Sequence, residues 1–293
     1  KTKMGVALAK KFNGEVISGD SMQIYKQMDI GTAKVTEEEK EGIIHHCVDI
    51  LNPDETYSVH DFQQTVRKKI TEITQRGHVP IIVGGTGLYI KAALYDYQFD
   101  EMENDHHAIN EKYKDYTNEQ LHDHLKSIDE ESAKTLHFNN RRRILRAIEI
   151  YETTGKRKSE MLEEQEHICL YDAYFVGLTL PRDILYERIN KRVDVMMKNG
   201  LKEEMDQLYS QGLTRNHQSM KAIGYKEWFD YYDRQIDLND VLELIKKHSR
   251  QYAKRQYTWF KNQFDVHWYD VNLENFEQTI EQVTDDIEKI LKV

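Results

Sequence analysis

The spacing of apolar residues at the start of the chain predicts a helix followed by a strand. Met4, Leu8 and Phe12 recur at i, i+4 and i+8, which is typical of one face of a helix. Asn13-Gly14 then supplies a C-terminal stop, and residues 15–18 form a short apolar run that predicts a strand ending at Gly19-Asp20-Ser21. Because the pattern begins in mid-helix and without Met, we expect that a segment preceding Lys1 is missing from this sequence.

A second helix and a second strand follow in the same order. Residues 58–76 carry Ser58 as an N-cap, Asp61 near the third helical position and an apolar stripe at 62, 66, 70 and 73. Residues 79–83 form the continuous apolar run of a buried parallel strand, which leads through Gly84-Gly85-Thr86-Gly87 into a helix starting at Leu88. Strands and helices in this alternation predict a parallel α/β sheet, with ligands beyond the carboxyl ends of its strands.

From about Glu101 the chain becomes strongly charged and helical, and no strand pattern returns before Tyr171. We therefore predict a helical insertion at 101–165 within a catalytic core made of 1–100 and 166–293. Residues 173–180 predict a strand that returns to the sheet, Pro181 opens another helix with an inner face at 185, 189, 193 and 196, and residues 239–261 predict a long final helix.

Composition narrows the class of protein. The 293 residues hold 51 Asp and Glu against 41 Lys and Arg, a formal net charge of −10, and are 39% hydrophobic, which predicts a globular protein of one large or two modest domains. No run approaches the roughly 18 apolar residues that a membrane helix needs. Two distant cysteines, Cys47 and Cys169, suit a reducing, cytoplasmic setting, and the 13 histidines show no metal-ligand spacing. The acidic excess argues against general nucleic-acid coating but allows a local basic face.

Three short segments offer candidate chemistry near the predicted strand ends. Residues 19–23, Gly-Asp-Ser-Met-Gln, bring a carboxylate, a hydroxyl and an amide together, although an Asp after a strand is more often a turn or helix cap. The loop Gly84–Gly87 brings backbone N–H groups close to a ligand or simply makes a tight turn. Lys1-Thr2 matches the end of a phosphate-binding loop, where the Lys contacts phosphate and the Thr hydroxyl contacts Mg²⁺, or is an arbitrary start.

Basic residues are grouped in two helices. Arg141-Arg142-Arg143 opens a helix, where cations oppose the helix dipole unless anions bind them, and a solvated charge run is the alternative. In the long helix, Arg250, Lys254, Tyr257 and Lys261 fall on one face, opposite an apolar face at 241, 245, 248, 252 and 259. Such a stripe suits an RNA backbone with a base stacked nearby, but also an ordinary solvent face.

Several longer motifs together resemble bacterial tRNA dimethylallyltransferases. They are residues 19–25 (GDSMQIY), 28–34 (MDIGTAK), 84–89 (GGTGLY), 143–149 (RILRAIE), 222–226 (AIGYK) and 251–260 (QYAKRQYTWF), and they span nearly the whole chain. The resemblance implies a P-loop NTPase-like α/β core with an inserted, mainly helical domain. It also implies a preceding strand and phosphate loop, of which only Lys1-Thr2 is present here.

The same resemblance implies a reaction and its participants. The enzymes of this family transfer a dimethylallyl group from dimethylallyl diphosphate to N6 of adenosine 37, in the anticodon stem-loop of tRNAs that read codons starting with U, and release pyrophosphate. An exocyclic adenine amine is a poor nucleophile, so Asp20 is expected to accept its proton as a general base. Mg²⁺ is the expected cofactor, and we expect a monomer without a membrane segment.

The residues of the expected site follow from these motifs. Asp20, Thr86 and Arg192 are the catalytic candidates, with Arg192 holding phosphate unless it forms a surface salt bridge with Glu187 or Asp194. Lys1 and Thr2 are the donor-binding candidates, and Thr2 is the metal ligand. The expected tRNA contacts are Asp20, Ser21, Met22, Gln23, Thr86, Arg142, Arg143, Ile144, Leu145, Arg146, Lys221, Ala222, Ile223, Gly224, Tyr225, Lys226, Arg250, Lys254, Arg255, Tyr257 and Lys261.

Three other functions remain open at this point. An adenylate isopentenyltransferase would use a free nucleotide as acceptor, but a mononucleotide needs neither the helical insertion nor the cationic helix. In a P-loop nucleotide kinase, Asp20 would orient a phosphate acceptor. A non-catalytic RNA-binding module would not require Asp20 and the glycine-rich loop at neighbouring strand ends. Assays with AMP, with tRNA and with ATP as donor would separate these functions.

Overall fold

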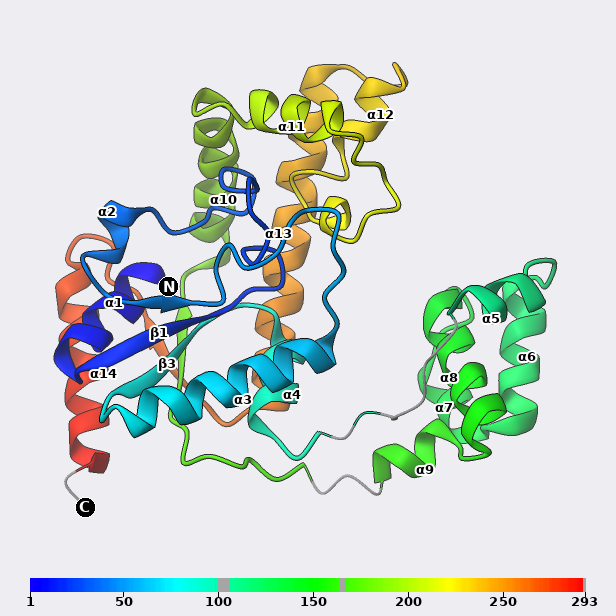
Figure 1. Ribbon diagram of the computed structural model, residues 1–293, viewed down its shortest axis with the longest axis horizontal. Helices are drawn as coiled ribbons and strands as arrows, with labels where there is room; N and C mark the ends of the chain where they lie inside the picture. Colours follow the sequence, from blue (N-terminus) through cyan, green and yellow to red (C-terminus); the bar gives the residue numbers. More distant parts are fainter. Residues whose placement is uncertain (98, 100–105, 164–166, 292–293) are drawn as a thin grey trace. The chain divides into compact units, whose positions relative to one another are not determined.

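The computed structural model describes residues 1–97, 99, 106–163 and 167–291 (Figure 1). The chain forms two compact units: residues 1–94 together with 171–293 make the first, and residues 95–170 make the second. The predicted domain limits at 100, 101, 165 and 166 lie outside the described residues.

The first unit begins with the predicted alternation of helices and parallel strands. Helix α1 (Thr2–Lys11) leads into β1 (Gly14–Gly19), and α3 (Val59–Gln75) leads into β3 (Val79–Gly84) and α4 (Gly87–Leu94). Strand β1 pairs in parallel with β3 and with the short β2 (His45–His46), so the sheet order is β2-β1-β3. The prediction of a parallel α/β sheet in this part of the chain is confirmed.

Local sequence explains where α3 begins. Ser58 accepts a hydrogen bond from the Asp61 backbone N–H at 3.1 Å, and the Asp61 carboxylate accepts one from the Ser58 N–H at 2.8 Å. This reciprocal pair satisfies two N–H groups that the helix leaves without partners, which typically contributes about 1 kcal/mol. The buried face of α3, Phe62, Val66, Ile70 and Ile73, matches the predicted apolar stripe.

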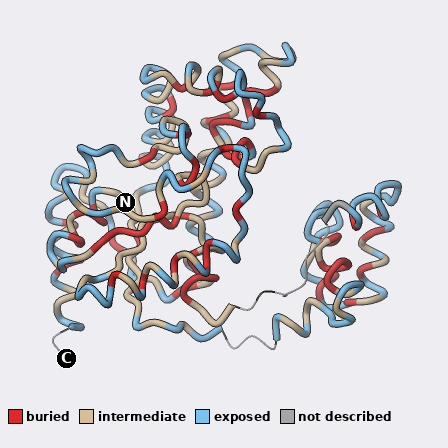
Figure 2. Tube along the Cα trace, viewed as in Figure 1, coloured by how far each residue is buried: buried red, intermediate tan, exposed pale blue. Residues whose placement is uncertain are grey.

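The core of the first unit surrounds β1. Val16 and Ile17 are both almost fully buried although they point to opposite faces of the sheet, since successive strand residues alternate. Helices α1 and α3 both pack against β1 and β3 (Figures 1 and 2). The apolar residues Val16 and Ile17 of β1 are buried on both faces of the sheet, whereas residues 80–84 of β3 are half-buried.

The predicted return of residues 173–180 to this sheet is wrong. Strand β4 (Phe175–Thr179) pairs instead with β5 (Val266–Asp270), also in parallel, to form a separate two-stranded sheet. Neither β5 nor the following helix α14 (Phe276–Leu291) was predicted, so the long helix α13 (Leu238–Gln263) is not the last element. Val176 and Leu178 of β4 pack on the same cluster of Met4, Leu8 and Val283 as Ile81 of β3, which ties both sheets to one core.

The second unit is a small helical body with its own core. Its helices are α5 (His106–Lys112), α6 (Asn118–Ile128), α7 (Glu130–Thr135), α8 (Arg141–Thr154) and α9 (Lys158–Glu163). Leu121 and Leu125 of α6 and Ile144 and Ile148 of α8 are fully buried together (Figure 2). The buried residues recur at i and i+4 on both helices, so each presents one apolar stripe to the other.

The other elements of the first unit are mostly helical. They are α2 (Glu37–Lys40), α10 (Arg182–Lys198), α11 (Leu201–Ser210), the 3₁₀ turn Ser219–Lys221 and α12 (Trp228–Tyr232). Helix α10 begins immediately after Pro181, as predicted. In the parts of the chain that the structure describes, no helix combines the length and the apolar character needed to cross a bilayer.

Candidate active site

The carboxyl ends of β1 and β3 lie directly beside each other. Gly19 pairs with Gly84 at the last register position, and the Thr86 N–H donates to the Gly19 carbonyl at 3.1 Å. Two residues after Gly19, the Ser21 N–H donates to Thr86 Oγ1, also at 3.1 Å. The predicted site residues of the 19–23 segment and of the glycine-rich loop are therefore brought together.

Asp20 is held in a defined orientation but keeps a free oxygen. Its Oδ1 accepts a hydrogen bond from the Met22 N–H at 2.9 Å, so the carboxylate does form the turn that is common for an Asp after a strand. Among the residues that the structure describes, Oδ2 accepts no hydrogen bond, and the side chain is only half-buried. An oriented carboxylate with one unused oxygen is suited to accept a proton from a ligand.

The glycines of the 84–87 loop are required by protein packing. A Cβ at Gly84 would lie 2.2 Å from the backbone of Gly19, one at Gly85 would lie 2.1 Å from the Gln256 amide, and one at Gly87 would lie 2.1 Å from the Trp259 ring. The backbone of Gly19 and the ring of Trp259 therefore leave no room for a side chain at Gly84 and Gly87, whether or not a ligand binds. These contacts also show that α13 lies against the loop.

Helix α13 contributes side chains that the sequence did not assign to the site. The Gly85 carbonyl accepts hydrogen bonds from Gln256 Nε2 at 2.9 Å and from the Tyr252 hydroxyl at 3.3 Å. Burial raises the pKa of Tyr252, and the nearby charge of Asp20 acts in the same direction. The spacing i, i+4 and i+7 places Tyr252, Gln256 and Trp259 on one face of the helix. The same spacing is equally typical of a face that only packs against the core, so the sequence did not indicate a role in the site.

A group of cations lies near the same strand ends. The Lys1 ammonium would be 3.0 Å from a Cβ at Gly85. Burial lowers the pKa of the Lys1 side chain, the charge of Asp20 opposes this shift and the charge of Arg192 reinforces it, so all three groups lie within electrostatic reach.

The salt bridge considered for Arg192 is not present among the described residues. Glu187 pairs with Lys191 at 2.8 Å, and Asp194 pairs with Lys246 at 2.9 Å. The exposed guanidinium of Arg192 is thus left near Lys1 without a carboxylate from the part of the chain that the structure describes. This arrangement suits an anion.

The predicted cationic stripe of α13 is only partly available. Arg250 Nη1 donates to Asn190 of α10 at 2.5 Å and is half-buried, whereas Lys254 and Lys261 are exposed. Tyr257 is 47% exposed and its ring contacts Trp268 of β5, with 4.8 Å between centroids. The Arg255 guanidinium lies over the Tyr252 ring at 5.8 Å.

A pocket lies along the same helix. Seven residues of α13 line it, among them Lys254, Arg255 and Trp259. Trp259 Nε1 is buried there and has no hydrogen-bond partner among the described residues. Lys254 of the predicted stripe therefore lines the same pocket as Trp259, the residue whose ring covers Gly87.

Several residues of the 221–226 segment are buried. In this segment Ala222, Gly224 and Tyr225 are buried, Ile223 is half-buried, and Lys221 and Lys226 are exposed. The Tyr225 ring packs on Gly31 and its hydroxyl donates to Glu204, so the side chain is engaged inside the protein, and the contact of this residue with tRNA stays a prediction. Direct contact with a partner is possible here for the two lysines.

In the second unit, too, some of the predicted RNA-contact residues are buried and others are exposed. Ile144 and Leu145 belong to its core, so their predicted RNA contact is not supported by their side-chain positions. Arg142 and Arg143 are exposed, whereas Arg146 is half-buried and forms an ion pair with Glu149 at 2.9 Å. Arg141 donates to the carbonyls of Tyr113 and Tyr116, at 2.6 Å each, and serves the fold of the unit.

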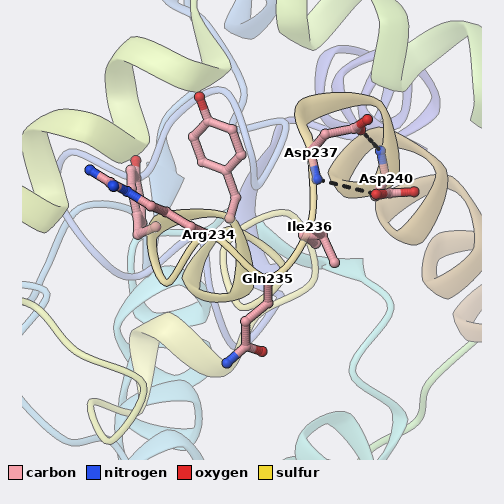
Figure 3. A pocket seen from close by; sticks show the side chains of 7 residues that line it. Arg234, Gln235, Ile236, Asp237 and Asp240 are labelled. Carbon is pink, nitrogen blue, oxygen red and sulfur yellow. Dashed lines mark hydrogen bonds between the residues drawn. The ribbon is translucent and has the colours of Figure 1, made fainter.

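Another pocket lies at the junction of α12 and α13 (Figure 3). It is lined by residues 231, 232, 234–237 and 240, none of which belongs to the predicted site. Asp237 and Asp240 are already engaged there, since each caps the backbone N–H of the other at the start of α13.

The fold and site define an α/β enzyme that gathers a carboxylate, hydroxyls and cations beyond the carboxyl ends of parallel strands. The sequence profile described as IPP transferase matches residues 23–263. The chain belongs to the IPP transferase family.

Individual relatives agree with this assignment. A Bacillus cereus protein named tRNA dimethylallyltransferase is 53% identical over 274 residues, covering 92% of this chain and 86% of its own. The crystal structure of the full-length tRNA isopentenylpyrophosphate transferase from Bacillus halodurans matches with a TM-score of 0.76 and 44% identity, over 100% of this chain and 93% of that one. A eukaryotic dimethylallyltransferase acting on tRNA matches with a TM-score of 0.84 and 32% identity, over 97% and 74% of the two chains.

Proposed function

We propose that this protein transfers a dimethylallyl group from dimethylallyl diphosphate to N6 of adenosine 37 in tRNAs that read codons starting with U, and releases pyrophosphate. The observation that carries the proposal is the meeting of Asp20, Thr86 and the Lys1 ammonium at neighbouring strand ends beneath Tyr252. The relatives named above, whose names state action on tRNA, support the acceptor.

Asp20 would act as the general base. The amine lone pair of adenine is delocalised into the ring, so the N6 atom becomes nucleophilic only as its proton leaves. The unused Oδ2 of Asp20 accepts this proton while the bond from N6 to the allylic carbon forms and the bond from that carbon to the diphosphate oxygen breaks. The Met22 N–H holds Asp20 in place, and Ser21 and Thr86 hold the adjoining backbone.

Gln23 would accept a hydrogen bond from the adenine base through its side-chain oxygen, Oε1. Its Nε2 donates to the carbonyls of Thr32 and Ala33 at 3.3 Å each, and its Oε1 accepts from Ser18 Oγ at 3.2 Å. Both amide hydrogens are used by the protein, so the second lone pair of Oε1 is the group left for a ligand. An acceptor at this position suits the N–H of an exocyclic amine.

Cations would stabilise the leaving diphosphate. Negative charge develops on the leaving oxygens, and the Lys1 ammonium and Arg192 guanidinium lie within electrostatic reach of each other and of Asp20. This pattern, at the end of β1 and the start of α1, supports a P-loop NTPase-like core.

The donor groups of this site fit Mg²⁺. In the described part of the chain no cluster of three or more His, Cys, Asp or Glu residues forms a metal cage, and Thr2 offers a half-buried hydroxyl beside Lys1. Mg²⁺ typically uses one or two protein oxygens and completes its shell with phosphate oxygens and water. Thr2 would hold the ion, which would neutralise charge on the diphosphate.

Exposed cations would bind the tRNA backbone. The candidates are Lys254, Arg255 and Lys261 of α13, Lys221 and Lys226 before α12, and Arg142 and Arg143 of the second unit. Their contacts with phosphate would hold the anticodon arm while the target base leaves its stack to enter the site.

The proposal is tested by the product. Protein incubated with Mg²⁺, dimethylallyl diphosphate and unmodified tRNA carrying adenosines at positions 36 to 38 should release pyrophosphate and add the prenyl group at position 37, as read by mass spectrometry of digested tRNA. Parallel reactions contain AMP as acceptor, or ATP as donor. Prenylation of AMP in preference to tRNA would make the protein an adenylate isopentenyltransferase, and ATP-dependent nucleotide phosphorylation without an adduct would make it a kinase.

A further inference from the structure

The carboxylate of Glu204 in α11 accepts hydrogen bonds from three consecutive backbone N–H groups, those of residues 29–31, which are far from Glu204 in sequence. Its Oε2 accepts from the N–H groups of Asp29 and Ile30 at 2.8 and 2.7 Å, and its Oε1 accepts from that of Gly31 at 3.0 Å. Oε1 also accepts from the Tyr225 hydroxyl at 2.6 Å. Hydrogen bonds to an ionised acceptor are stronger than those between neutral groups, so this carboxylate is a strong anchor for three consecutive residues.

The anchored segment is the one that holds Gln23. Residues 32 and 33, immediately after the anchored amides, supply the two carbonyls that receive the Gln23 amide hydrogens. The Thr32 hydroxyl donates back to the Met28 carbonyl at 2.6 Å and closes the loop on itself. A shift of Gly31 would therefore move both carbonyls that orient Gln23.

This loop needs external support. Gln27 and Ala33, on either side of the anchored amides, have φ values of +63° and +50°, a left-handed conformation that is unfavourable for residues other than glycine. At Gly31 a Cβ would lie 2.5 Å from the Tyr225 ring, so backbone and ring are in direct contact. The buried Lys34 ammonium adds a second anchor through the Tyr25 carbonyl at 2.8 Å and the Asp49 carboxylate at 2.6 Å.

We propose that Glu204 is a positioning residue for the transfer reaction: by holding the N–H groups of residues 29–31, it fixes the carbonyls that orient the Gln23 amide toward the accepting base. Tyr225 assists by holding Glu204 and by packing on Gly31. The inference rests on the proposed function, in which Gln23 contacts the base that receives the prenyl group. This proposal also gives Tyr225, which is buried within the 222–226 motif, a role inside the protein.

The same helix offers a matched control. Asp206, two residues after Glu204, accepts from the Tyr232 hydroxyl at 2.6 Å and from Lys202 at 2.5 Å. It is likewise a carboxylate of α11 bonded to a tyrosine, but its partners belong to α11 and α12 and not to the loop of Gln23. Asp206→Ala therefore removes a comparable structural contact without touching the site.

Steady-state kinetics with tRNA and dimethylallyl diphosphate test the role. Glu204→Ala should lower kcat by about 10- to 100-fold while changing both KM values less than about threefold, because orientation of the base is lost but phosphate contacts remain. Glu204→Gln, which keeps an acceptor for two of the amides, should recover most of the rate. Asp206→Ala should keep kcat within about twofold of the parent.

A double-mutant cycle asks whether Glu204 acts through Gln23. On a Gln23→Ala background, Glu204→Ala should cost little additional rate, because the group it orients is already absent. If the two losses multiply, or if Asp206→Ala lowers kcat as much as Glu204→Ala, the positioning role is wrong. Should Glu204→Ala fail to fold, Tyr225→Phe, which removes only the hydroxyl, takes its place in the cycle. A parent protein that makes no adduct would overturn the proposed function itself, which separates the two failures.

Discussion

At the scale of single residues, Asp20 is the group on which the proposed chemistry depends most directly. Asp20→Asn keeps the oxygen that accepts from Met22 and removes the basic carboxylate. We expect single-turnover prenyl transfer to fall about 10²-fold or more, with tRNA binding nearly unchanged, since loss of a general base typically costs about 10²–10⁴ in rate. Rates within about threefold of the parent would exclude Asp20 as the base.

Glu15 shows how the residue scale also determines stability. Its carboxylate is covered by Arg76, His46 and His78, with N to O distances of 2.7, 2.6 and 2.7 Å. The hydrogen bond from Arg76 lowers its pKa to about 2, against burial, which acts in the opposite direction. A carboxyl pKa depressed on folding adds stability above its unfolded value, and this stability is lost as the pH falls toward about 2.

We therefore predict that Glu15→Gln lowers the free energy of unfolding at pH 7 by about 1–2 kcal/mol. This is less than the full pKa shift implies, because Arg76 and His78 are partly exposed and solvent screens the interaction. The difference from the parent should shrink as the pH falls from about 4.5, where Glu15 of the unfolded parent becomes protonated, toward about 2, where Glu15 of the folded parent does. Denaturant titrations at several pH values measure it, with the exposed Glu38→Gln as control; a difference that does not depend on pH would contradict the assignment.

At the scale of elements, helix α13 combines two functions on different faces. Its inner face, through Tyr252, Gln256 and Trp259, covers the glycine-rich loop. Its outer face carries Lys254 and Lys261. The sequence predicted an apolar face and a cationic face. In the structure the apolar face lies against the glycine-rich loop, and Arg250 of the cationic face is hydrogen-bonded to Asn190.

We predict that Lys254→Gln together with Lys261→Gln weakens tRNA binding and flattens its salt dependence. Each lost phosphate contact should reduce the slope of log affinity against log salt by about 0.9 for duplex or 0.7 for single-stranded RNA. Arg250→Gln should change stability through Asn190 but leave the slope nearly unchanged. Filter binding at several salt concentrations checks this, and an unchanged slope in the double variant would make the stripe an ordinary solvent face.

At the scale of the whole molecule, the two compact units have separate cores, and this separation can be measured. Leu125 is fully buried among residues of the second unit only. Leu125→Ala should destabilise that unit by about 2–5 kcal/mol, the usual cost of a leucine-sized cavity. Hydrogen exchange followed by mass spectrometry should show faster exchange in peptides of 106–163 and unchanged protection in β1 and β3. Equal loss of protection in both units would mean that they unfold as one.

The sequence by itself determined the local elements with strong internal patterns. The capping pair Ser58 and Asp61, the apolar stripe of α3 and the uninterrupted strand at 79–83 are short-range features, because the groups that satisfy one another lie within a few residues. The motifs at 19–23 and 84–87 likewise placed the candidate site at the carboxyl edge of the sheet. The family resemblance rested on the same contiguous residues.

Only the tertiary structure decided which distant groups meet. The partner of β4 is β5 rather than the first sheet, and this pairing brings together residues far apart in sequence: Gly177 lies opposite Trp268, whose ring occupies the space that a side chain at 177 would need. The burial of Tyr225 and the hydrogen bond from Arg250 to Asn190 also depend on residues that are far apart in sequence, so no local pattern predicts them. Glu204 reads as one charge on an amphipathic helix, and its role as an anchor for residues 29–31 exists only because folding places three backbone N–H groups around it.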